Sequence, residues 1–454
     1  MKIQEKILFC LFSSTFLFGF YLFSYKIQRD DTFLLLTSYT LLFVILYLWI
    51  RKYNSLIGVF IIGLICRALF WEHVPSLSED FYRFLWDGNI QLLGINPYQY
   101  NPSQIIDSVI FPNSSIIYNQ MSDLSSINYT NYPPLSQYLF KLICYLDQNG
   151  ILYYVKGIRC VYLIGEICLF FGAKFLLEYL KLDPKYIAWY FLNPLVIVEG
   201  FGNLHGESFM LCFTIFSWIF CFKKNPFLGG LFMALAIGIK LLPLLFIPFF
   251  FRFLGYRKFI LFALISGFFS IIIWFPFFNG IMIENYLSTI RLWFNYFEFN
   301  GSVYKIIRFI GYKTYGYNII RQLGNITPFI NIGLIFCFSF LYSNLNNKRI
   351  FESLLLFLSC YFFISTTIHP WYIINLILVG IISGYAFPII WSLTVFWSYN
   401  AYSSNVIQEN IVLQLFSYCL VYGCFFYEIY YKKLGHHLQK PNFFSSKSSP
   451  FTSW

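Results

Sequence analysis

Long apolar runs separated by short polar stretches occupy most of the chain. A helix needs about 20 apolar residues to cross the hydrocarbon core of a bilayer, and most of the runs are close to this length. The pattern predicts an all-α polytopic membrane protein with roughly eleven to thirteen spans, the range reflecting segments that are short or interrupted by Pro or Gly. The runs cover residues 7–25, 33–50, 56–74, 158–180, 186–201, 206–222, 226–251, 257–278, 325–343, 350–367, 371–400 and 411–431.

Composition supports a membrane protein and gives no support for nucleic acid as a partner. Of the 454 residues, 58% are hydrophobic and only 11% are charged, and the mean hydropathy is +0.64. The net charge of +11 comes from short basic clusters between apolar runs, without a basic stripe on a soluble domain. A nucleic-acid-binding function is therefore not indicated. We expect a single transmembrane domain over residues 1–431, followed by a cytoplasmic, Ser-rich and disordered tail at 432–454.

The distribution of Lys and Arg suggests an orientation, because basic residues collect on the cytoplasmic side of a membrane. The clusters at Lys2/Lys6, Arg51/Lys52, Lys181/Lys185, Lys223/Lys224, Arg252/Arg257/Lys258, Lys348/Arg349 and Lys432/Lys433 are all cytoplasmic if residues 135–155 do not fully cross. Residues 75–134 then form a large first extracytoplasmic loop, in which Arg83 is the single basic residue against five acids. Lys156 and Arg159 conflict with this topology, because they also lie outside.

In this topology, five polar stretches meet on one face of the membrane. They are SEDFYRFLWDG (78–88), TNYPPL (130–135), NLHGE (203–207), FEFNGS (297–302) and TTIHPWY (366–372). Any one of them alone is typical of interfacial anchors at helix ends, whereas five together favour an active site. Lys240 and Arg67 add ionisable groups within apolar runs, which tend to mark function, although Arg67 has the alternative of snorkelling to the interface.

The first of these stretches carries the candidate chemistry. If residues 79–93 form a short helix capped by Ser78, then Asp80, Arg83 and Asp87 share one face. A salt-bridge ladder on a solvated helix explains this spacing equally well. The chain lacks a G-x-S-x-G elbow, a Walker loop and an H-E-x-x-H pair, so the commoner hydrolase, nucleotide and zinc-protease sites are not indicated. A carboxylate base is what remains.

An ordered set of motifs resembles a known family. DFYRFLWDG, GINPYQY, NYPPLSQ, FLNPLVIVEGFGNLHGE, ALAIGIKLLPLLFIP, FNGS and IHPWY resemble bacterial polyprenyl-phosphomannose-dependent mannosyltransferases of the GT-C glycosyltransferase superfamily. Their order is also similar to that of the eukaryotic mannosyltransferase that adds the first mannose of the GPI anchor. The resemblance covers most of residues 60–390, and the ordered set is more specific than any motif alone.

The resemblance implies a GT-C type enzyme of a bacterial inner membrane. Such an enzyme takes a hexose, here mannose, from a polyprenyl-phosphate donor on the extracytoplasmic face and transfers it with inversion to a glycan or glycolipid acceptor. An acidic residue of the first large loop, 75–134, is the catalytic base, which carries over to Asp80 with Glu79 and Asp87 as competitors. The family pattern often has two acids separated by one residue, whereas Glu79 and Asp80 are adjacent, so the choice of base stays open.

A phosphate leaving group needs positive charge or hydrogen-bond donors. The second extracytoplasmic loop, 279–324, holds five basic residues against two acids, which a lipid-phosphate site or an ordinary cytoplasmic loop would explain. His205 and His369 have the alternative role of hydrogen bonding at helix ends. The candidate substrate-binding residues are Arg83, Asn96, Tyr132, Asn203, His205, Glu207, Lys240, Asn300, Arg308, His369, Trp371 and Tyr372.

Three questions stay open at the level of sequence. Adjacent carboxylates can bind a divalent cation, but two acids are too few to specify one, so no cofactor is assigned. A flippase or transporter of lipid-linked saccharides would also use intramembrane Lys and Arg for phosphate groups. An inactive relative that acts as a scaffold would share the motifs as well.

Overall fold

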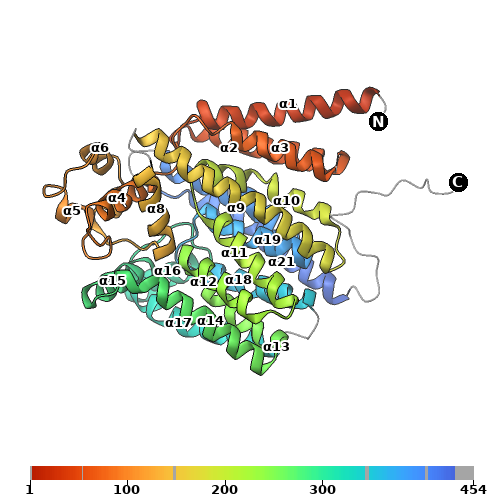
Figure 1. Ribbon diagram of the computed structural model, residues 1–454. Helices are drawn as coiled ribbons and strands as arrows, with labels where there is room; N and C mark the ends of the chain where they lie inside the picture. The colour runs from red at the N-terminus through yellow and green to blue at the C-terminus, as the bar shows by residue number, and fades with distance from the viewer. Residues whose placement is uncertain (1–2, 54, 147–149, 343–346, 404–406, 435–454) are drawn as a thin grey trace.

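The structure is a computed structural model that describes residues 3–53, 55–146, 150–342, 347–403 and 407–434 (Figure 1). The regular elements of these residues are all helical, without a β-strand; the nearest approach to one is a pair of isolated bridges from Phe299 and Asn300 to Thr367. The expected all-α class is thereby confirmed. Of the tail expected at 432–454, residues up to Leu434 continue the last helix, and the remainder lies outside the described residues.

The helices follow one another along the chain with few long connections. The α-helices are α1 (Ile3–Tyr25), α2 (Thr32–Lys52), α3 (Leu56–Ala68), α4 (Asp80–Leu92), α5 (Pro102–Ile105), α6 (Ser114–Asn119), α7 (Asp123–Ile127), α8 (Pro134–Leu146), α9 (Ile151–Tyr179), α10 (Ala188–Phe191), α11 (Glu207–Phe222), α12 (Pro226–Ile239), α13 (Phe250–Leu254), α14 (Tyr256–Trp274), α15 (Gly280–Asn295), α16 (Val303–Tyr315), α17 (Ile320–Phe336), α18 (Asn347–Ile364), α19 (Ile373–Ser383), α20 (Phe387–Thr394) and α21 (Ile411–Leu434). The 3₁₀ and π segments are η1 (Pro184–Ile187), η2 (Val196–Gly202), η3 (Leu242–Phe249), η4 (Phe275–Phe277), η5 (Cys337–Tyr342), η6 (Pro370–Tyr372) and η7 (Val395–Tyr402).

Five helical segments among the described residues are long and apolar enough to cross a membrane: Thr32–Lys52, Ile151–Tyr179, Tyr256–Phe277, Ile320–Leu341 and Ile411–Tyr431. A sixth arises if Val196–Gly202 and Glu207–Phe222 count as one span bent by 101°. Five more apolar helices are shorter: Phe9–Tyr25, Leu56–Ala68, Pro226–Ile239, Leu242–Leu254 and Pro370–Ser383. The roughly eleven to thirteen spans expected from apolar runs therefore include several that the fold divides into short helices at polar or Pro-containing breaks.

The region 135–155, whose crossing was uncertain, holds the 13-residue helix α8 and the start of α9. A 13-residue helix is about 20 Å long, less than the roughly 30 Å of a hydrocarbon core. The two basic residues that conflicted with the topology have local partners. Lys156 pairs with Glu72 at 2.7 Å, and the buried Arg159 donates to the backbone carbonyls of Phe70, His73 and Gly202. Arg159 of α9 therefore links the residues that follow α3 to the end of the π-helical segment η2.

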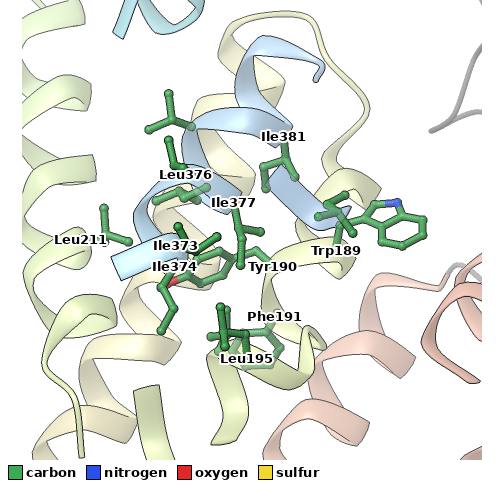
Figure 2. Packing of buried hydrophobic residues seen from close by; sticks show 14 of the residues in the cluster. Trp189, Tyr190, Phe191, Leu195, Leu211, Ile373, Ile374, Leu376, Ile377 and Ile381 are labelled. Carbon is green, nitrogen blue, oxygen red and sulfur yellow. The ribbon is translucent and has the colours of Figure 1, made fainter. Parts of the chain in front are cut away.

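The main hydrophobic core lies where α10, α11 and α19 meet. Figure 2 shows Ile373, Ile374 and Ile377 of α19 gathered with Tyr190 and Leu211, all of them buried. This packing fixes α19, and with it the adjacent Pro370–Tyr372 segment, against the chain that leads into α11.

Arg67 of α3 is fully buried and does not snorkel. Its guanidinium pairs with the buried Glu166 of α9 and donates to the carbonyls of Gly63 and Phe191 at 2.9 and 3.0 Å. A buried charge pair with additional hydrogen bonds is costly to break on one side only. Arg67 thus ties α3 to α9 within the apolar core.

The segment 75–134 carries the expected short helix, α4, and three further short helices, α5 to α7. In Figure 1 α4, α5, α6, α8 and α15 lie together at one end of the molecule, away from α10 and α13. Helix α4 packs on α8 so closely at Gly88 that an added Cβ would come within 2.6 Å of the Phe140 carbonyl oxygen and of Cys144 Sγ. The glycine of WDG therefore permits this close contact between α4 and α8.

Candidate active site

All five polar stretches contribute side chains to one cavity of about 1560 Å³. Pockets for small ligands occupy about 300–1,000 Å³, so this one is large enough for more than one substrate group. Residues of the stretches that line it are Ser78, Glu79, Asp80, Arg83, Phe84, Thr130, Asn131, Tyr132, Pro133, His205, Gly206, Glu207, Phe297, Phe299, Thr366, Thr367, His369, Pro370, Trp371 and Tyr372. The convergence expected from the topology is thus observed in the fold.

Asp80 is the first residue of α4, one residue later than the predicted helix start. Its own N–H donates to Ser78 Oγ at 3.3 Å, and its carboxylate lies at the positive end of the helix dipole. Tyr132 donates its hydroxyl to Asp80 Oδ2 at 3.3 Å, and Nδ1 of His205 lies 3.9 Å from the same oxygen. Burial, and then the charge of Asp80, hold the pKa of Tyr132 well above its usual range, so the phenol keeps the proton that it donates.

Glu79 differs from its neighbour in its surroundings. It is exposed, and its Oε1 pairs with Nη1 of Arg29 at 3.5 Å. The Arg29 guanidinium also lies over the ring of Tyr402, 3.4 Å from the centroid, and lines the cavity. Sequence reasoning missed Arg29, although its position between the first two apolar runs puts it on the same side as segment 75–134.

Asp87, the third candidate acid, is fully buried and does not line the cavity. It accepts from Nε of Arg83 at 2.7 Å and from Nε2 of Gln137 at 2.8 Å. Arg83 also donates to the carbonyls of Ser125 and Asn128, which ties α4 to α7 and to the residue that follows it. Half of the predicted ladder is therefore present, and it is internal; in the described part of the chain no ion pair joins Asp80 to Arg83.

His205 occupies a break between two helices. The π-helical segment η2 ends at Gly202, α11 begins at Glu207, and Leu204 between them has a left-handed φ of 63°. Non-glycine residues in this region are strained and cluster at functional sites. The imidazole of His205 stacks on the Trp371 ring, with 3.6 Å between centroids and 16° between planes. The break thereby presents a buried imidazole to the cavity.

Lys240 follows the last residue of α12 and has an extended backbone. It forms an ion pair with Glu207, the first residue of α11, and its side chain is about one quarter exposed where it lines the cavity. Ser136 of α8 donates to the Ile239 carbonyl at 2.9 Å, which satisfies a group left free by the end of the helix. A cation at the end of an apolar helix is thus held at the cavity wall.

The stretch TTIHPWY supplies an aromatic wall. Trp371 lies between two imidazoles, because the ring of His369 stacks on it with 4.4 Å between centroids and a 2° interplanar angle. Burial first, and then the neighbouring His205 and Lys240, lower the pKa of His369 to about 3. His369 is therefore neutral near pH 7 and acts here through its ring and hydrogen-bonding atoms.

The structure does not bring five of the predicted residues to the cavity. Asn96 donates to the Phe277 carbonyl, Asn203 donates to Glu199, and Arg308 pairs with Glu298 at 2.9 Å. Asn300 is buried against α21, where the Tyr418 hydroxyl donates to its carbonyl, and Asp87 is internal as described above. The five basic residues of the loop 279–324 do not line the cavity either; they are Arg291, Lys305, Arg308, Lys313 and Arg321.

Two walls of the cavity differ in chemistry. One wall is polar and carries hydroxyl, amide and carboxylate groups from Ser122, Asp123, Asn128, Tyr129, Thr130 and Asn131. Another is apolar and consists of Leu241, Leu242, Leu244, Leu245, Ile290 and Phe294. Hydroxyl-rich ligands suit the first wall and hydrocarbon chains suit the second. Within the described ranges, no three His, Cys, Asp or Glu side chains gather into a group that could hold a metal ion.

Comparisons with known proteins agree with the motif resemblance. A family model described as alpha-(1->6)-mannopyranosyltransferase, N-terminal domain, matches residues 32–255. The chain is similar to alpha-(1->6)-mannopyranosyltransferase A of Corynebacterium glutamicum, with 22% identity over 195 residues that cover 41% of this chain and 38% of the relative. It is also similar to alpha-(1->6)-mannopyranosyltransferase A of Mycobacterium tuberculosis, with 24% identity over 177 residues that cover 39% of this chain and 33% of the relative.

The matches thus span less than two fifths of the length of these curated relatives. The family match includes Asp80, Tyr132, His205 and Lys240, whereas the stretches at 297–302 and 366–372 lie beyond it. The resemblance to bacterial mannosyltransferases is confirmed: residues 32–255 match the alpha-(1->6)-mannopyranosyltransferase family, and both relatives carry that name.

Proposed function

We propose that the protein transfers mannose from a polyprenyl-phosphate donor to a glycan or glycolipid acceptor, at the extracytoplasmic face of a bacterial inner membrane. The observation that carries the proposal is the position of Asp80 in a cavity that is lined by polar residues of the segment 122–131 and by the leucines that follow Lys240. The names of the relatives specify alpha-(1->6)-mannopyranosyl transfer, which supports mannose as the sugar.

Asp80 is the catalytic base of this proposal. Its carboxylate takes the proton of the acceptor hydroxyl while the oxygen attacks the anomeric carbon, and the bond from that carbon to the lipid phosphate breaks. A single displacement inverts the anomeric centre, so a β-linked donor gives an α-linked product. Tyr132 orients the carboxylate by donating to Oδ2, which leaves Oδ1 for the acceptor. Glu79 is the weaker candidate because it already pairs with Arg29.

Lys240 is the residue that we assign to the leaving phosphate. Negative charge grows on this group as the glycosidic bond breaks, and a fixed cation stabilises it more strongly in a cavity than in water. Glu207 holds the ammonium in place before the donor binds. Leu241, Leu242 and Leu245 follow Lys240 directly in the chain and line the cavity, so they are placed to receive the first isoprene units of the donor.

Aromatic rings complete the sugar site. Tyr372 lines the cavity, and an aromatic face binds the apolar face of a pyranose. Trp371 supports this wall from between the imidazoles of His205 and His369, which cover its faces. Arg83, which lines the cavity, links the sugar site to the loop 121–133. Its guanidinium donates hydrogen bonds to the carbonyls of Ser125 and Asn128. This loop supplies the polar wall, and we assign the acceptor to it.

The test is transfer of radiolabelled mannose from polyprenyl-phosphomannose by membranes that contain the protein. Wild type is expected to label a lipid or glycan product, and Asp80→Asn at matched expression is expected to abolish the label. Glu79→Gln serves as the neighbouring control and is expected to retain activity. Equal labelling with and without the wild-type protein, over several acceptor extracts, would contradict the proposal.

A further inference from the structure

Glu199 is a buried acid that the proposed chemistry has not used. It lies on η2, does not line the cavity, and is 0% exposed. Two donors bind its carboxylate: the Tyr399 hydroxyl at 2.7 Å on Oε1 and Asn203 Nδ2 at 3.1 Å on Oε2. A buried carboxylate with this support in an apolar region requires an explanation, because burying an ionisable group is costly.

The imidazole of His205 lies between this acid and the proposed base. Nε2 of His205 is 3.4 Å from Glu199 Oε2, and Nδ1 is 3.9 Å from Asp80 Oδ2. The ring is 2% exposed, and Nε2 has no hydrogen-bond partner of good geometry. Both distances exceed those of hydrogen bonds, as is common for catalytic groups before substrates bind.

We infer that Glu199 is a positioning residue that acts through His205, and that His205 relays the proton away from Asp80 after each transfer. This inference rests on the proposed function. A carboxylate only accepts hydrogen bonds, so Glu199 favours the tautomer with the proton on Nε2. That tautomer leaves the lone pair of Nδ1 directed at Asp80.

The proton balance follows from this arrangement. Asp80 gains the acceptor hydroxyl proton as the new glycosidic bond forms and the lipid phosphate departs. The carboxyl group of the protonated Asp80 then turns so that its O–H faces Nδ1 of His205 and donates the proton there. His205 becomes an imidazolium, and Asp80 returns to its carboxylate form. The imidazolium releases the proton to water in the cavity, since His205 lines it. Charge on the imidazolium is stabilised by Glu199 and by the face of Trp371.

The local fold is built to hold this geometry. Glu199 sits in the π-helical turn, and His205 follows the strained Leu204 in the adjacent break. The backbone N–H of His205 donates to the Glu199 carbonyl at 3.1 Å, so the two residues are joined through main chain as well as side chains. π-helical segments occur frequently at functional sites. A merely structural acid would not need to face the imidazole.

The experiment is a double-mutant cycle on the full-length protein, with polyprenyl-phosphomannose as donor and octyl α-mannoside as acceptor probe. Glu199→Gln is expected to lower kcat about 10- to 100-fold while the donor KM changes less than about threefold, because the lost function is positioning. In a His205→Ala background, the same substitution is expected to change kcat less than about twofold, since the residues act as one unit.

Two further variants make the outcome decisive. Tyr399→Phe removes one hydrogen bond from Glu199 and is expected to lower kcat about 3- to 10-fold. Glu352→Gln is the matched control, because Glu352 also accepts from a tyrosine hydroxyl, that of Tyr385 at 2.5 Å, but does not line the cavity. It is expected to keep the wild-type kcat.

Three results would overturn the inference. The first is a full effect of Glu199→Gln that persists in the His205→Ala background, which indicates a structural role. The second is a wild-type kcat for Glu199→Gln or, where that variant does not fold, for Tyr399→Phe. The third is the absence of mannose transfer by the wild-type protein, which would remove the proposed function and the relay with it; the first two outcomes leave that function intact.

Discussion

Replacing Asp80 or Asp87 by Asn is expected to have opposite consequences, although the two acids lie on one helix. Asp80 is about one third exposed and receives one hydrogen bond, at 3.3 Å. Its loss should lower stability by only about 0–1 kcal/mol, as for other solvent-accessible interactions. A general base contributes about 10²- to 10⁴-fold to a rate, equivalent to about 3–5 kcal/mol of barrier, so Asp80→Asn should lose transfer by that factor.

Asp87 is 0% exposed and pairs with an Arg83 side chain that is 3% exposed. Removing one partner of a buried ion pair costs about 3–5 kcal/mol, and Asn retains the shape and one acceptor, so we expect the lower end of this range. Asp87→Asn should therefore unfold at a lower temperature while the folded fraction keeps most of its activity.

The assay combines thermal unfolding in detergent with mannose transfer normalised to folded protein from size-exclusion chromatography. Glu79→Gln is the control for a change of charge at the start of α4. The reasoning would be refuted if Asp87→Asn lost activity at wild-type stability while Asp80→Asn remained active. That result would move the base from the cavity wall to the interior of the loop.

Three other perturbations follow from the structure. Lys240→Gln should lower kcat/KM for the donor about 10- to 100-fold, because a hydrogen bond to a charged group contributes about 1.5–3 kcal/mol, and an unchanged kcat/KM in steady-state assays would contradict the phosphate role. The pKa of His369 is lowered to about 3 by burial, below its unfolded value, so its contribution to stability is present above about pH 6.5 and is lost as the pH falls towards 3. His369→Gln should thus reduce the loss of stability between pH 7 and pH 5 by about 2 kcal/mol, measured by denaturation at both pH values, and an unchanged loss would show that the imidazole is not held neutral. Gly88→Ala should destabilise by about 1–3 kcal/mol because the new carbon meets the Phe140 carbonyl, whereas Gly423→Ala, which meets open space, should not; equal melting temperatures for the two variants would refute the close contact.

Sequence patterns predicted the class of the fold and the convergence of the polar stretches, because both depend on hydropathy. Apolar length marks membrane segments, and the positive-inside pattern placed NLHGE and TTIHPWY on the same face as segment 75–134. The hydropathy pattern could not give the number of continuous spans. The helix break at Lys240 and the bend before Glu207 depend on packing partners that are far away in the chain.

Individual roles were less accessible for the same reason. The spacing of Asp80, Arg83 and Asp87 placed the three on one face of a helix. In the fold, α8 and the loop 121–133 bury the Arg83–Asp87 ion pair, whereas Asp80 is left at the cavity without a salt bridge to Arg83. Arg29 was missed because nothing in its neighbourhood signals a site. Glu199 lies in the motif FLNPLVIVEGFGNLHGE, but its spacing from His205 did not mark it as a partner of the imidazole. The fold shows the role of each residue by its partner. Arg29 pairs with Glu79, fifty residues along the chain, and Glu199 faces the imidazole of His205.

The most direct test of the account follows the sugar and its anomeric carbon together. Purified wild-type protein in liposomes would receive β-linked polyprenyl-phosphomannose labelled with ¹³C at the anomeric carbon and octyl α-mannoside, and NMR would follow the label. The account predicts an α-mannosidic product and an equal amount of free polyprenyl phosphate, both lost with Asp80→Asn. A donor that stays intact while it moves between the leaflets, or a product that keeps the β configuration, would contradict it.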